Sequence, residues 1–462
     1  MGINFSPFEI GRRALRASQL GLTVTGQNIA NVNTPGYTRR ALQLSPSPPN
    51  GSNLGLVGNG VSIDGVRQLR DQFIESRLRT ETAIAGRLTA QRDALSPVDA
   101  AFNESDGNGI SAAMSKFFSS FGALEANPVS TTLRNDVIAK TGLLSASFAA
   151  TRSRLVSIQS DADSELRASV SKLNTLSQQI AELNVSIANA EHSGGTASEL
   201  RDQRDQLVQD AAQLSGVRAV EDQDGMVSLT LGDGQALVSG AQVTNLQVQD
   251  IPPSGLVQIT LNGQPAVIFD GRLRGLLNAA DNIEEQITSL DDLAASIASR
   301  VNALHSSGTD LNSNPGINFF QVPTNGPLTA ANLTISAAIK ANPSLIVASP
   351  LAPPATSATV AGAIAALLSD PSSQAGTRTG SFSSIYASIV SEAGKGVRSA
   401  EDALVTQQAI LNQTLAQRDA ISGVSLDEEA INLLQYQKSY EAAARFLKIA
   451  DELTQTILSL GQ

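Results

Sequence analysis

Residues 28–37 read Asn-Ile-Ala-Asn-Val-Asn-Thr-Pro-Gly-Tyr, and this stretch decides where the first helix of the chain ends. A proline disfavours the helical conformation of the residue before it, so Pro35 moves Thr34 out of a helix. Pro35 and Gly36 also suit the two central positions of a type II turn. We therefore predict a helix that ends before the turn and a short strand from Tyr37 to Leu44 after it.

The segment before the turn has the periodicity of a helix from about Ser6 to Gln27. Large apolar residues recur every seven positions, and a neighbouring row that includes small residues alternates spacings of four and three. Small side chains in such a row allow a second helix to approach closely, although an ordinary buried helix face has the same periodicity. Asn28 and Asn31 can hydrogen-bond the last helical turn or adopt left-handed geometry. The large residues are Phe8, Leu15, Leu22 and Ile29, and the second row is Ile10, Ala14, Ala17, Gly21 and Val24.

The other end of the sequence also carries a helix with an apolar face. Residues 382–460 have a helical pattern with one interruption at residues 422–425. Three adjacent apolar rows give the last helix a broad face that must be buried, either against its own chain or against a partner. The rows are Leu433, Tyr440 and Leu447; Tyr436, Ala443, Ala450 and Ile457; and Phe446, Leu453 and Leu460.

Between the two ends, a long helical stretch precedes β-rich sequence. The stretch from about Thr131 to Ala190 is long enough for a rod-like helix. One heptad row in it consists of Leu166, Leu173, Ile180 and Ile187. From Val217 to Phe269, short β-branched runs separate turn signals such as Asp224-Gly225, which is typical of β-structure. Residues 308–361 return to proline, glycine and asparagine with short apolar runs, and we expect them to join the same β-rich insert.

These patterns predict a multi-domain, mainly α-helical fold with a β-rich insert. Because helices begin and end the sequence, we expect a discontinuous, coiled-coil-like α-helical core domain whose halves come from the two termini, plus an outer β domain. The terminal core is expected in 1–60 and 423–462, and a long-helix bundle in 61–216, 273–307 and 362–422. The outer β domain is expected in 217–272 and 308–361.

The composition argues against most enzymes and against nucleic-acid binders. The 462 residues include 32 basic and 43 acidic side chains, so the net charge of −11 cannot neutralise a phosphate backbone. The absence of cysteine excludes disulfides, thiolate nucleophiles and cysteine–zinc sites. Two histidines leave little for acid–base or metal chemistry. No apolar run is long enough to cross a bilayer, and the first twenty residues lack the apolar core of a secretory signal peptide.

The few motifs that resemble catalytic or ligand sites have simpler structural explanations. His305-Ser306 lacks a nucleophile elbow, and a hydrogen-bonded structural histidine is the favoured interpretation. Residues 222–225 start like a calcium loop but lack the glutamate, so a hairpin turn is expected. Glu428-Glu429 suits a solvated helix face or a favourable position at a helix start. We therefore predict no catalytic, cofactor-binding or metal site.

Several motifs together resemble one protein family. Residues 26–39, Gly-Gln-Asn-Ile-Ala-Asn-Val-Asn-Thr-Pro-Gly-Tyr-Thr-Arg, resemble the N-terminal signature of flagellar rod, hook and hook-associated proteins. Their Thr-Pro-Gly-Tyr-x-Arg form is similar to that of the flagellar hook-associated protein 1 family, the junction proteins between hook and filament. Further similar blocks are residues 57–79, 200–207, 302–305, 308–312, 319–320, 423–430 and 440–445. The resemblance thus covers both ends and the middle of the sequence.

The resemblance implies a non-enzymatic subunit of an extracellular tube. It implies export without a cleaved signal peptide by the flagellar type III system, and location at the hook–filament junction of a bacterial flagellum. The implied partners are the hook protein, the second hook-associated protein, further copies of the chain in a ring or tube, and an export chaperone on the last helix; no nucleic acid, membrane insertion or cofactor is implied. The residues expected to serve assembly are Leu15, Leu22, Asn28, Asn31, Thr34, Pro35, Gly36, Tyr37, Arg39, Leu426, Leu433, Tyr440, Leu447 and Leu453.

Two questions stay open at the level of sequence. The alternative function is a secreted adhesin or enzyme with an unrecognised site in the β-rich insert. The alternative for the two ends is a helical hairpin that is always folded within one chain. Against that hairpin, we expect both ends to be mobile in the free monomer and to order only when neighbouring subunits bury them, because isolated helices are marginally stable in water.

Overall fold

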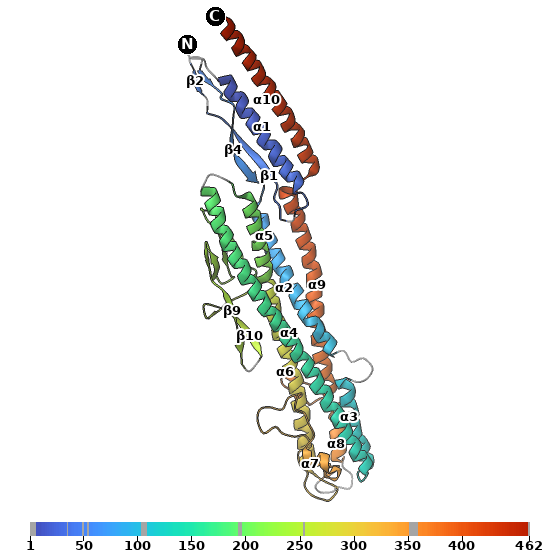
Figure 1. Cartoon of the computed structure of the whole chain (residues 1–462). Coiled ribbons are helices and arrows are strands. Elements are labelled where there is room, and N and C mark those ends of the chain that lie inside the picture. Colours follow the sequence, from blue (N-terminus) through green and yellow to red (C-terminus); the bar gives the residue numbers. More distant parts are fainter. Residues whose placement is uncertain are drawn as a thin grey trace.

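The computed structural model describes residues 6–34, 36–48, 50–52, 55–102, 109–192, 196–252, 255–350 and 359–460. The molecule is elongated, with long helices running along its length and both ends of the chain at the same end of the rod (Figure 1). Small sheets lie beside the helices rather than between them (Figure 1). The predicted multi-domain, mainly α-helical fold with a β-rich insert is confirmed.

Two helices from opposite ends of the sequence form the terminal pair, α1 (Ser6–Ala30) and α10 (Leu426–Leu460). They pack against each other beyond the end of the bundle (Figure 1). Glycines of α1 allow the close approach: a Cβ at Gly21 would lie 2.5 Å from Cδ1 of Tyr436, and a Cβ at Gly11 2.6 Å from Cδ2 of Leu447. The α1 row that contains Gly21 therefore faces α10, in the single-chain arrangement of the hairpin alternative.

A β-hairpin lies beside the terminal pair. Strand β1 (Arg40–Pro46) pairs antiparallel with β4 (Val61–Gln68), with an irregularity between Gln43 and Leu44. Between them, β2 (Asn50–Ser52) pairs with β3 (Gly55–Val57). The strand expected from Tyr37 begins three residues later. The domain boundary expected after residue 60 is wrong, because it would separate the two strands of one hairpin.

Five long helices in the described part of the chain form the bundle. They are α2 (Gln72–Phe102), α4 (Thr131–His192), α5 (Ser198–Ser215), α6 (Gly271–Ser306) and α9 (Phe382–Ser422). Helix α4 has 62 residues, which at 1.5 Å per residue is about 93 Å. Its predicted heptad row is confirmed as core: Leu166, Leu173, Ile180 and Ile187 are each at most 1% exposed.

The β-structure predicted for residues 217–269 is present. It forms a layer that packs on α4. Four antiparallel strands form one sheet: β5 (Arg218–Glu221), β6 (Val227–Thr230), β7 (Ala236–Ser239) and β8 (Gln242–Val243). A second sheet contains β9 (Leu246–Ile251), β10 (Leu256–Leu261) and β11 (Gln264–Pro265). Asn184 of α4 fastens the first sheet, because its amide donates to Val227 O and Gly240 O at 2.8 Å each. The hairpin turn expected at residues 222–225 is confirmed, with a positive φ of 76° at Gly225.

The end of the rod far from the termini is a compact tip. Helices α3 (Ile110–Ala126), α7 (Ala337–Ala341) and α8 (Val360–Ala366) and the 3-10 helix η2 (Pro343–Leu345) pack there (Figure 1). The four short strands β12 (Gly308–Thr309), β13 (Ser349–Pro350), β14 (Gln374–Ala375) and β15 (Arg378–Thr379) form two isolated two-stranded pairs. The described residues of this segment, 308–350 and 359–361, therefore do not join the sheets on α4, and the expected single β domain is wrong for them.

Aromatic rings fill the core of the tip. Phe117, Phe121, Phe319 and Phe320 are all 0% exposed, with edge-to-face contacts such as Phe121–Phe319 at 5.4 Å between ring centroids. His305 lies against Phe319, and its Nε2 accepts a 2.9 Å hydrogen bond from Val347 N. Its Nδ1 donates to Ile317 O at 2.5 Å. The interpretation of His305 as a structural histidine is confirmed.

Candidate assembly site

The structure brings three residues that were expected to serve assembly, Asn28, Tyr37 and Arg39, together at the joint where the terminal pair meets the bundle. At its start, the predicted turn is present: Tyr37 N donates to Thr34 O at 3.2 Å, and Gly36 has a φ of +80°. That geometry is typical of a type II turn with glycine at its third position. Asn31 Nδ2 donates to Gln27 O at 2.9 Å, so this residue bonds the last helical turn as expected. Pro35 itself lies outside the described residues.

Asn28 is the centre of the joint and is only 1% exposed. Its side-chain nitrogen donates to Arg40 O at 2.9 Å and to Glu429 Oε2 at 3.1 Å. Its side-chain oxygen accepts from Arg40 N at 3.0 Å and from the Tyr37 hydroxyl at 2.9 Å. Both amide donors and both acceptor positions are thus used, which is what a buried asparagine needs to avoid a desolvation cost. One side chain therefore connects α1, the turn, β1 and α10.

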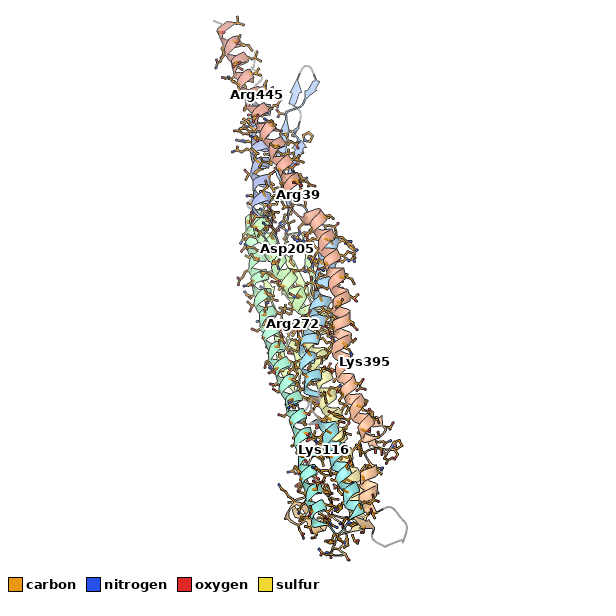
Figure 2. All side chains as sticks on the ribbon, turned by 90° about the vertical axis from the view of Figure 1, so that its right-hand side faces the viewer. Arg39, Lys116, Asp205, Arg272, Lys395 and Arg445 are labelled. Carbon is orange, nitrogen blue, oxygen red and sulfur yellow. The ribbon has the colours of Figure 1, made fainter. Side chains whose placement is uncertain are left out.

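A buried carboxylate joins the two ends of the chain. Glu429 is 1% exposed and receives Arg39 Nε at 2.8 Å on its other oxygen. Arg39 also reaches the exposed Glu428 at 2.7 Å, and its backbone N–H donates to Ser422 O at 2.9 Å. Figure 2 shows Arg39 at the level where the terminal pair meets the bundle. Glu429 lies in the first turn of α10, in agreement with the expected position at a helix start, but the solvated face is wrong for this residue, because it is buried and pairs with Arg39.

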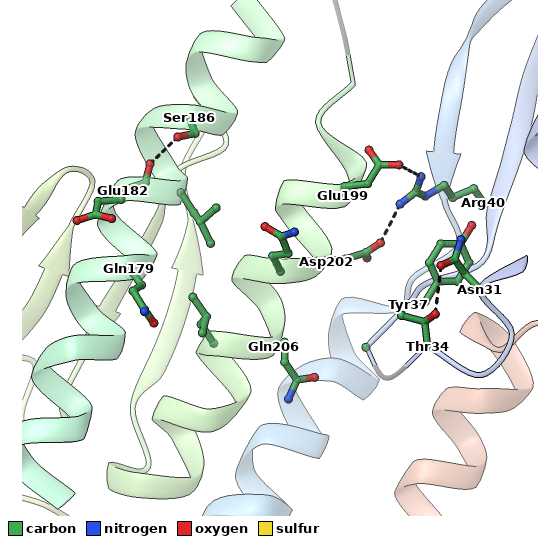
Figure 3. Close-up of a pocket in the computed structure, with 14 residues that line it drawn as sticks. Asn31, Thr34, Tyr37, Arg40, Gln179, Glu182, Ser186, Glu199, Asp202 and Gln206 are labelled. Carbon is green, nitrogen blue, oxygen red and sulfur yellow. Dashed lines mark hydrogen bonds and ion pairs between the residues drawn. The ribbon is translucent and has the colours of Figure 1, made fainter. Parts of the chain in front are cut away.

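Arg40 fastens the terminal pair to the bundle. Its guanidinium is buried and donates to Glu199 Oε1 at 2.5 Å and to Asp202 Oδ2 at 3.1 Å, both on α5 (Figure 3). It also lies over the ring of Tyr37, 5.0 Å from the centroid, in a cation–π geometry. Gln68 of β4 donates to the other oxygen of Asp202 at 2.6 Å. A carboxylate on α5 thus orients both strands of the hairpin.

The electrostatics of the joint favour the charged form of Arg40. Although burial alone would lower the pKa of Arg40, its hydrogen bonds to Glu199 and Asp202 raise it above the usual value. The same hydrogen bond lowers the pKa of Glu199. Burial raises the pKa of Asp202 despite Arg40, and burial likewise raises the pKa of Tyr37. The joint is therefore a partly desolvated network in which loss of one charge leaves another unpaired.

A pocket of about 720 Å³ opens between the joint and the bundle. Its walls are the turn at Gly36 and Tyr37, α5 around Gln203, and α4 around Leu183 (Figure 3). Among the described residues, no three His, Cys, Asp or Glu side chains are arranged to hold a metal ion. No helix in the described part of the chain is long and apolar enough to cross a membrane.

The structure brings together only some of the side chains expected to serve assembly. Asn28, Tyr37 and Arg39 meet at the joint, and Thr34 bonds Asn31. The partly buried Leu15, Leu22, Leu433 and Leu447 lie on the two helices of the pair, with Leu447 against Gly11. Leu426, Tyr440 and Leu453 instead face outward, at 52%, 42% and 60% exposure. The assembly role of this whole set stays a prediction.

Some residues that form the joint, or the contact between α1 and α10, were not among those expected to serve assembly. The buried positions of α10 are Glu429, Ala443 and Ala450, and Arg40 makes the contact with the bundle. The heptad row of Tyr436, Ala443 and Ala450 did indicate the contact between α1 and α10, since small residues at a heptad spacing permit close packing. Glu429 and Arg40 had no local signal, because their partners lie far away in sequence.

Comparison with known proteins gives three matching families along the chain. Residues 95–320 match the family described as "Flagellar hook-associated protein FlgK helical domain". Residues 8–38 match "Flagella basal body rod protein", and residues 416–460 match "Flagellar basal body rod FlgEFG protein C-terminal". The two rod-protein matches contain most of the terminal pair, and the third covers much of the bundle and the β-rich layer.

Whole-length relatives carry one name. Flagellar hook-associated protein 1 of Bacillus subtilis (strain 168) is 28% identical and covers 99% of each chain. Its namesake in Escherichia coli (strain K12) is 26% identical over 96% of this chain and 98% of that one. The fold is similar to a solved structure, the flagellar hook junction protein FlgK from Burkholderia pseudomallei, with a TM-score of 0.63 and 16% identity over 75% of this chain and 100% of that one. Along nearly its whole length, the chain is similar to proteins of the flagellar hook-associated protein 1 family.

Proposed function

We propose that this protein is a structural subunit of the hook–filament junction of a bacterial flagellum, and that it assembles through α1 and α10. The proposed partners are the hook protein on one side, the second hook-associated protein on the other, and further copies of this chain around the tube. Export proceeds through the flagellar type III system as an unfolded chain, with a chaperone on α10 beforehand. The absence of cysteine in all 462 residues suits this route, since no disulfide needs to be broken or made.

The observation that carries the proposal is the apolar surface of α10. Within one chain, α10 buries only three of its 35 residues. Its last three turns still expose large apolar side chains: Leu453, Ile457, Leu458 and Leu460 are 57–82% exposed. An exposed apolar stripe of this kind marks a surface for protein contact. Figure 2 shows this part of α10, with Arg445 labelled, extending beyond the bundle.

The joint supplies the second requirement, a defined direction for this stripe. Asn28, Arg39 and Glu429 connect both terminal helices, and Arg40 connects them to α5. A subunit of a tube must present its contacts at a fixed angle to its outer part. A network of buried, mutually satisfied polar groups gives such an angle better than apolar contact alone, because it has one bonding arrangement.

The proposal is tested by adding purified protein to isolated hooks and measuring bound protein. Leu453→Asp and Ile457→Asp place a charge on the exposed stripe, so hook-end binding should fall at least about tenfold, the equivalent of 1.4 kcal/mol. Ser439→Asp is the matched control, because Ser439 is an exposed polar residue on the same helix. Wild-type binding by the two stripe variants, with folded bundles by circular dichroism, would contradict the proposal.

A companion variant separates the two faces of α10. Leu447 packs at Gly11, so Leu447→Asp acts on the contact between α1 and α10 rather than on the exposed stripe. We expect it to abolish both chaperone binding and junction formation while the bundle keeps its unfolding temperature. An adhesin or enzyme that used the β-rich layer would instead keep its activity with a damaged α10 and lose it on deletion of residues 217–269.

A further inference from the structure

A second pocket, about 590 Å³ in volume, lies between the hairpin, the start of α2, α5 and the sheet of β5 and β6. Its walls are mostly polar, unlike the apolar seams of the bundle. Four arginines line it: Arg67 from β4, Arg70 just after that strand, Arg79 from α2 and Arg201 from α5. It does not overlap the pocket at the joint, because the two share no lining residue.

The carboxylates of this pocket are all engaged by arginines other than Arg79 and Arg67. Asp205 and Glu75 pair with Arg70, and Glu75 also receives Arg418 at 3.3 Å. Arg201 binds Glu191 at 2.7 Å and also Glu221, which Arg204 reaches at 3.4 Å. The lining thus contains four arginines and four carboxylates, and because the carboxylates are all paired, Arg67 and Arg79 are the unpaired charges of the lining.

Arg79 is the cation left without a partner. Among the residues that the structure describes, it has no ion pair and no hydrogen-bond acceptor, although its side chain is partly buried. Burial lowers its pKa, while Glu75 and Asp205 act on it only at longer range. A guanidinium has five N–H donors, and withdrawing them from water without an acceptor costs free energy. None of the Arg79 nitrogens is among the fully buried atoms that lack a partner, so these nitrogens are open to the pocket and can donate to a bound acceptor.

We propose that this pocket binds a small multivalent oxyanion of the phosphate or carboxylate class, held by Arg79 and Arg67. Arginine matches both groups because its planar fork donates two parallel hydrogen bonds to a pair of oxygens. Arg67 is exposed at the mouth and, like Arg79, makes no ion pair within the described residues, so two guanidinium groups remain for the ligand. Ser76 and Thr196 also line the pocket and can add hydroxyl donors.

The test uses the full chain and two probes, pyrophosphate and citrate, titrated by calorimetry at constant ionic strength. Wild-type protein should bind at least one probe saturably, and Arg79→Gln should weaken that binding at least about tenfold. Arg77→Gln is the matched control: Arg77 lies two residues away on the same helix, pairs with Glu81 at 3.6 Å and does not line the pocket. The Arg77→Gln variant should bind the probe with wild-type affinity.

A second variant keeps the test decisive if Arg79→Gln does not fold. Arg67 is exposed, so Arg67→Gln leaves the core untouched and should still weaken binding several-fold. Without a probe, a folded Arg79→Gln should be no less stable to urea than the wild type, since the change removes an unpaired charge. The proposal is overturned if the wild type binds neither probe saturably, or if Arg79→Gln and Arg67→Gln both bind with wild-type affinity.

Discussion

The two ends of the rod differ in how far they bury their large apolar side chains. At the tip, Phe117, Phe319 and Phe320 are 0% exposed and contact one another, so the core is complete within one chain. In the terminal pair, α10 buries small residues, Ala443 and Ala450, and leaves Ile457 66% exposed. The tip therefore owes its stability to its own packing, whereas the terminal pair leaves apolar area exposed.

This contrast teaches where stability and assembly can be altered independently. Local stability in a protein follows the density of buried apolar contacts, so the tip should open rarely and the pair more often. Changes at the tip should act on unfolding and leave hook binding intact. Changes at the joint and the pair should do the reverse. Four predictions test this separation, in order of decreasing expected effect.

The largest effect is expected from Phe319→Ala. Removing a fully buried phenylalanine leaves a cavity and should lower the free energy of unfolding of the tip by about 3–5 kcal/mol. Hydrogen exchange in α3 should accelerate accordingly, while hook binding stays unchanged. Phe73→Ala is the control, because Phe73 is 76% exposed on α2. Equal effects of the two variants on exchange in α3 would show that the aromatic cluster does not carry the stability of the tip.

The second prediction uses pH to act on the tip alone. Burial lowers the pKa of His305 from 6.5 to about 4. The unfolded chain therefore takes up a proton between these values and the folded chain does not, so stability is full above pH 6.5 and is lost as pH falls toward 4. The loss should approach about 3 kcal/mol by pH 4, at 1.36 kcal/mol per pH unit.

Urea unfolding at several pH values measures this dependence. Carboxylates titrate in the same range, so the informative quantity is the difference between wild type and His305→Gln, which should flatten the curve. If His305→Gln retains the full slope, another group is responsible.

The third prediction concerns the joint. Gly36 has a φ of +80°, and a Cβ there would also lie 3.0 Å from Gln206 Oε1. Gly36→Val should cost roughly 1–2 kcal/mol of backbone strain. Assembly onto hooks should drop while the bundle keeps its unfolding temperature. Gly58→Val is the control, since Gly58 has no atom within 4 Å of its Cβ position. Unchanged assembly by Gly36→Val would mean that the turn is only a surface connector.

The smallest effect is expected within the terminal pair. A Cβ at Gly21 would meet the ring of Tyr436 at 2.5 Å, so Gly21→Ala must displace the ring or part the helices. Gly26→Ala meets nothing within 4 Å and should gain up to about 1 kcal/mol of helix propensity. Hydrogen exchange across α10 in the free monomer should be faster in the first variant than in the second. Identical exchange would show that the pair does not depend on this contact.

The same measurement on the wild type decides the question of mobile ends. The structure pairs α1 with α10 in one chain, and slow exchange from Leu433 to Ile457 without a partner would mean that the pair is folded before assembly. Rapid exchange there would support ordering by neighbouring subunits.

The sequence predicted the features that depend on local periodicity. The heptad row of Leu166, Leu173, Ile180 and Ile187 is core because a long helix repeats one environment. The turn at Gly36 follows from the residues within it. Residues 308–361 were predicted as β-structure from the same turn residues, but their apolar side chains, such as Phe319 and Ile339, pack onto the helices of the tip instead. The composition of a segment predicts where the chain turns, but it does not predict which elements the segment packs against.

The centre of the joint was beyond such reasoning. Asn28 and Glu429 are 401 positions apart, and neither flanking sequence indicates a partner for the other. Two adjacent glutamates at a helix start look solvated by every local rule. Only the meeting of the two ends buries one of them and leaves the other exposed. The resemblance to hook-associated proteins indicated that both ends mattered, but not which side chains join them.

The distance in sequence between α1 and α10 also sets an order of events in time. The bundle and tip can close once α9 has emerged, because α9 packs on α2, whereas α1 has to wait until the segment containing Glu429 and Ala443 has emerged. Closing a loop of this length costs only slightly more entropy than closing a shorter one, so stability is little affected. The greater separation nevertheless slows the search for the native contact. A chain interrupted between α9 and α10 can still form its tip, but its first helix keeps an unmatched face and its joint lacks the buried carboxylate. The contact between α1 and α10 is thus the last to form, and it forms only when both helices are present in the same chain.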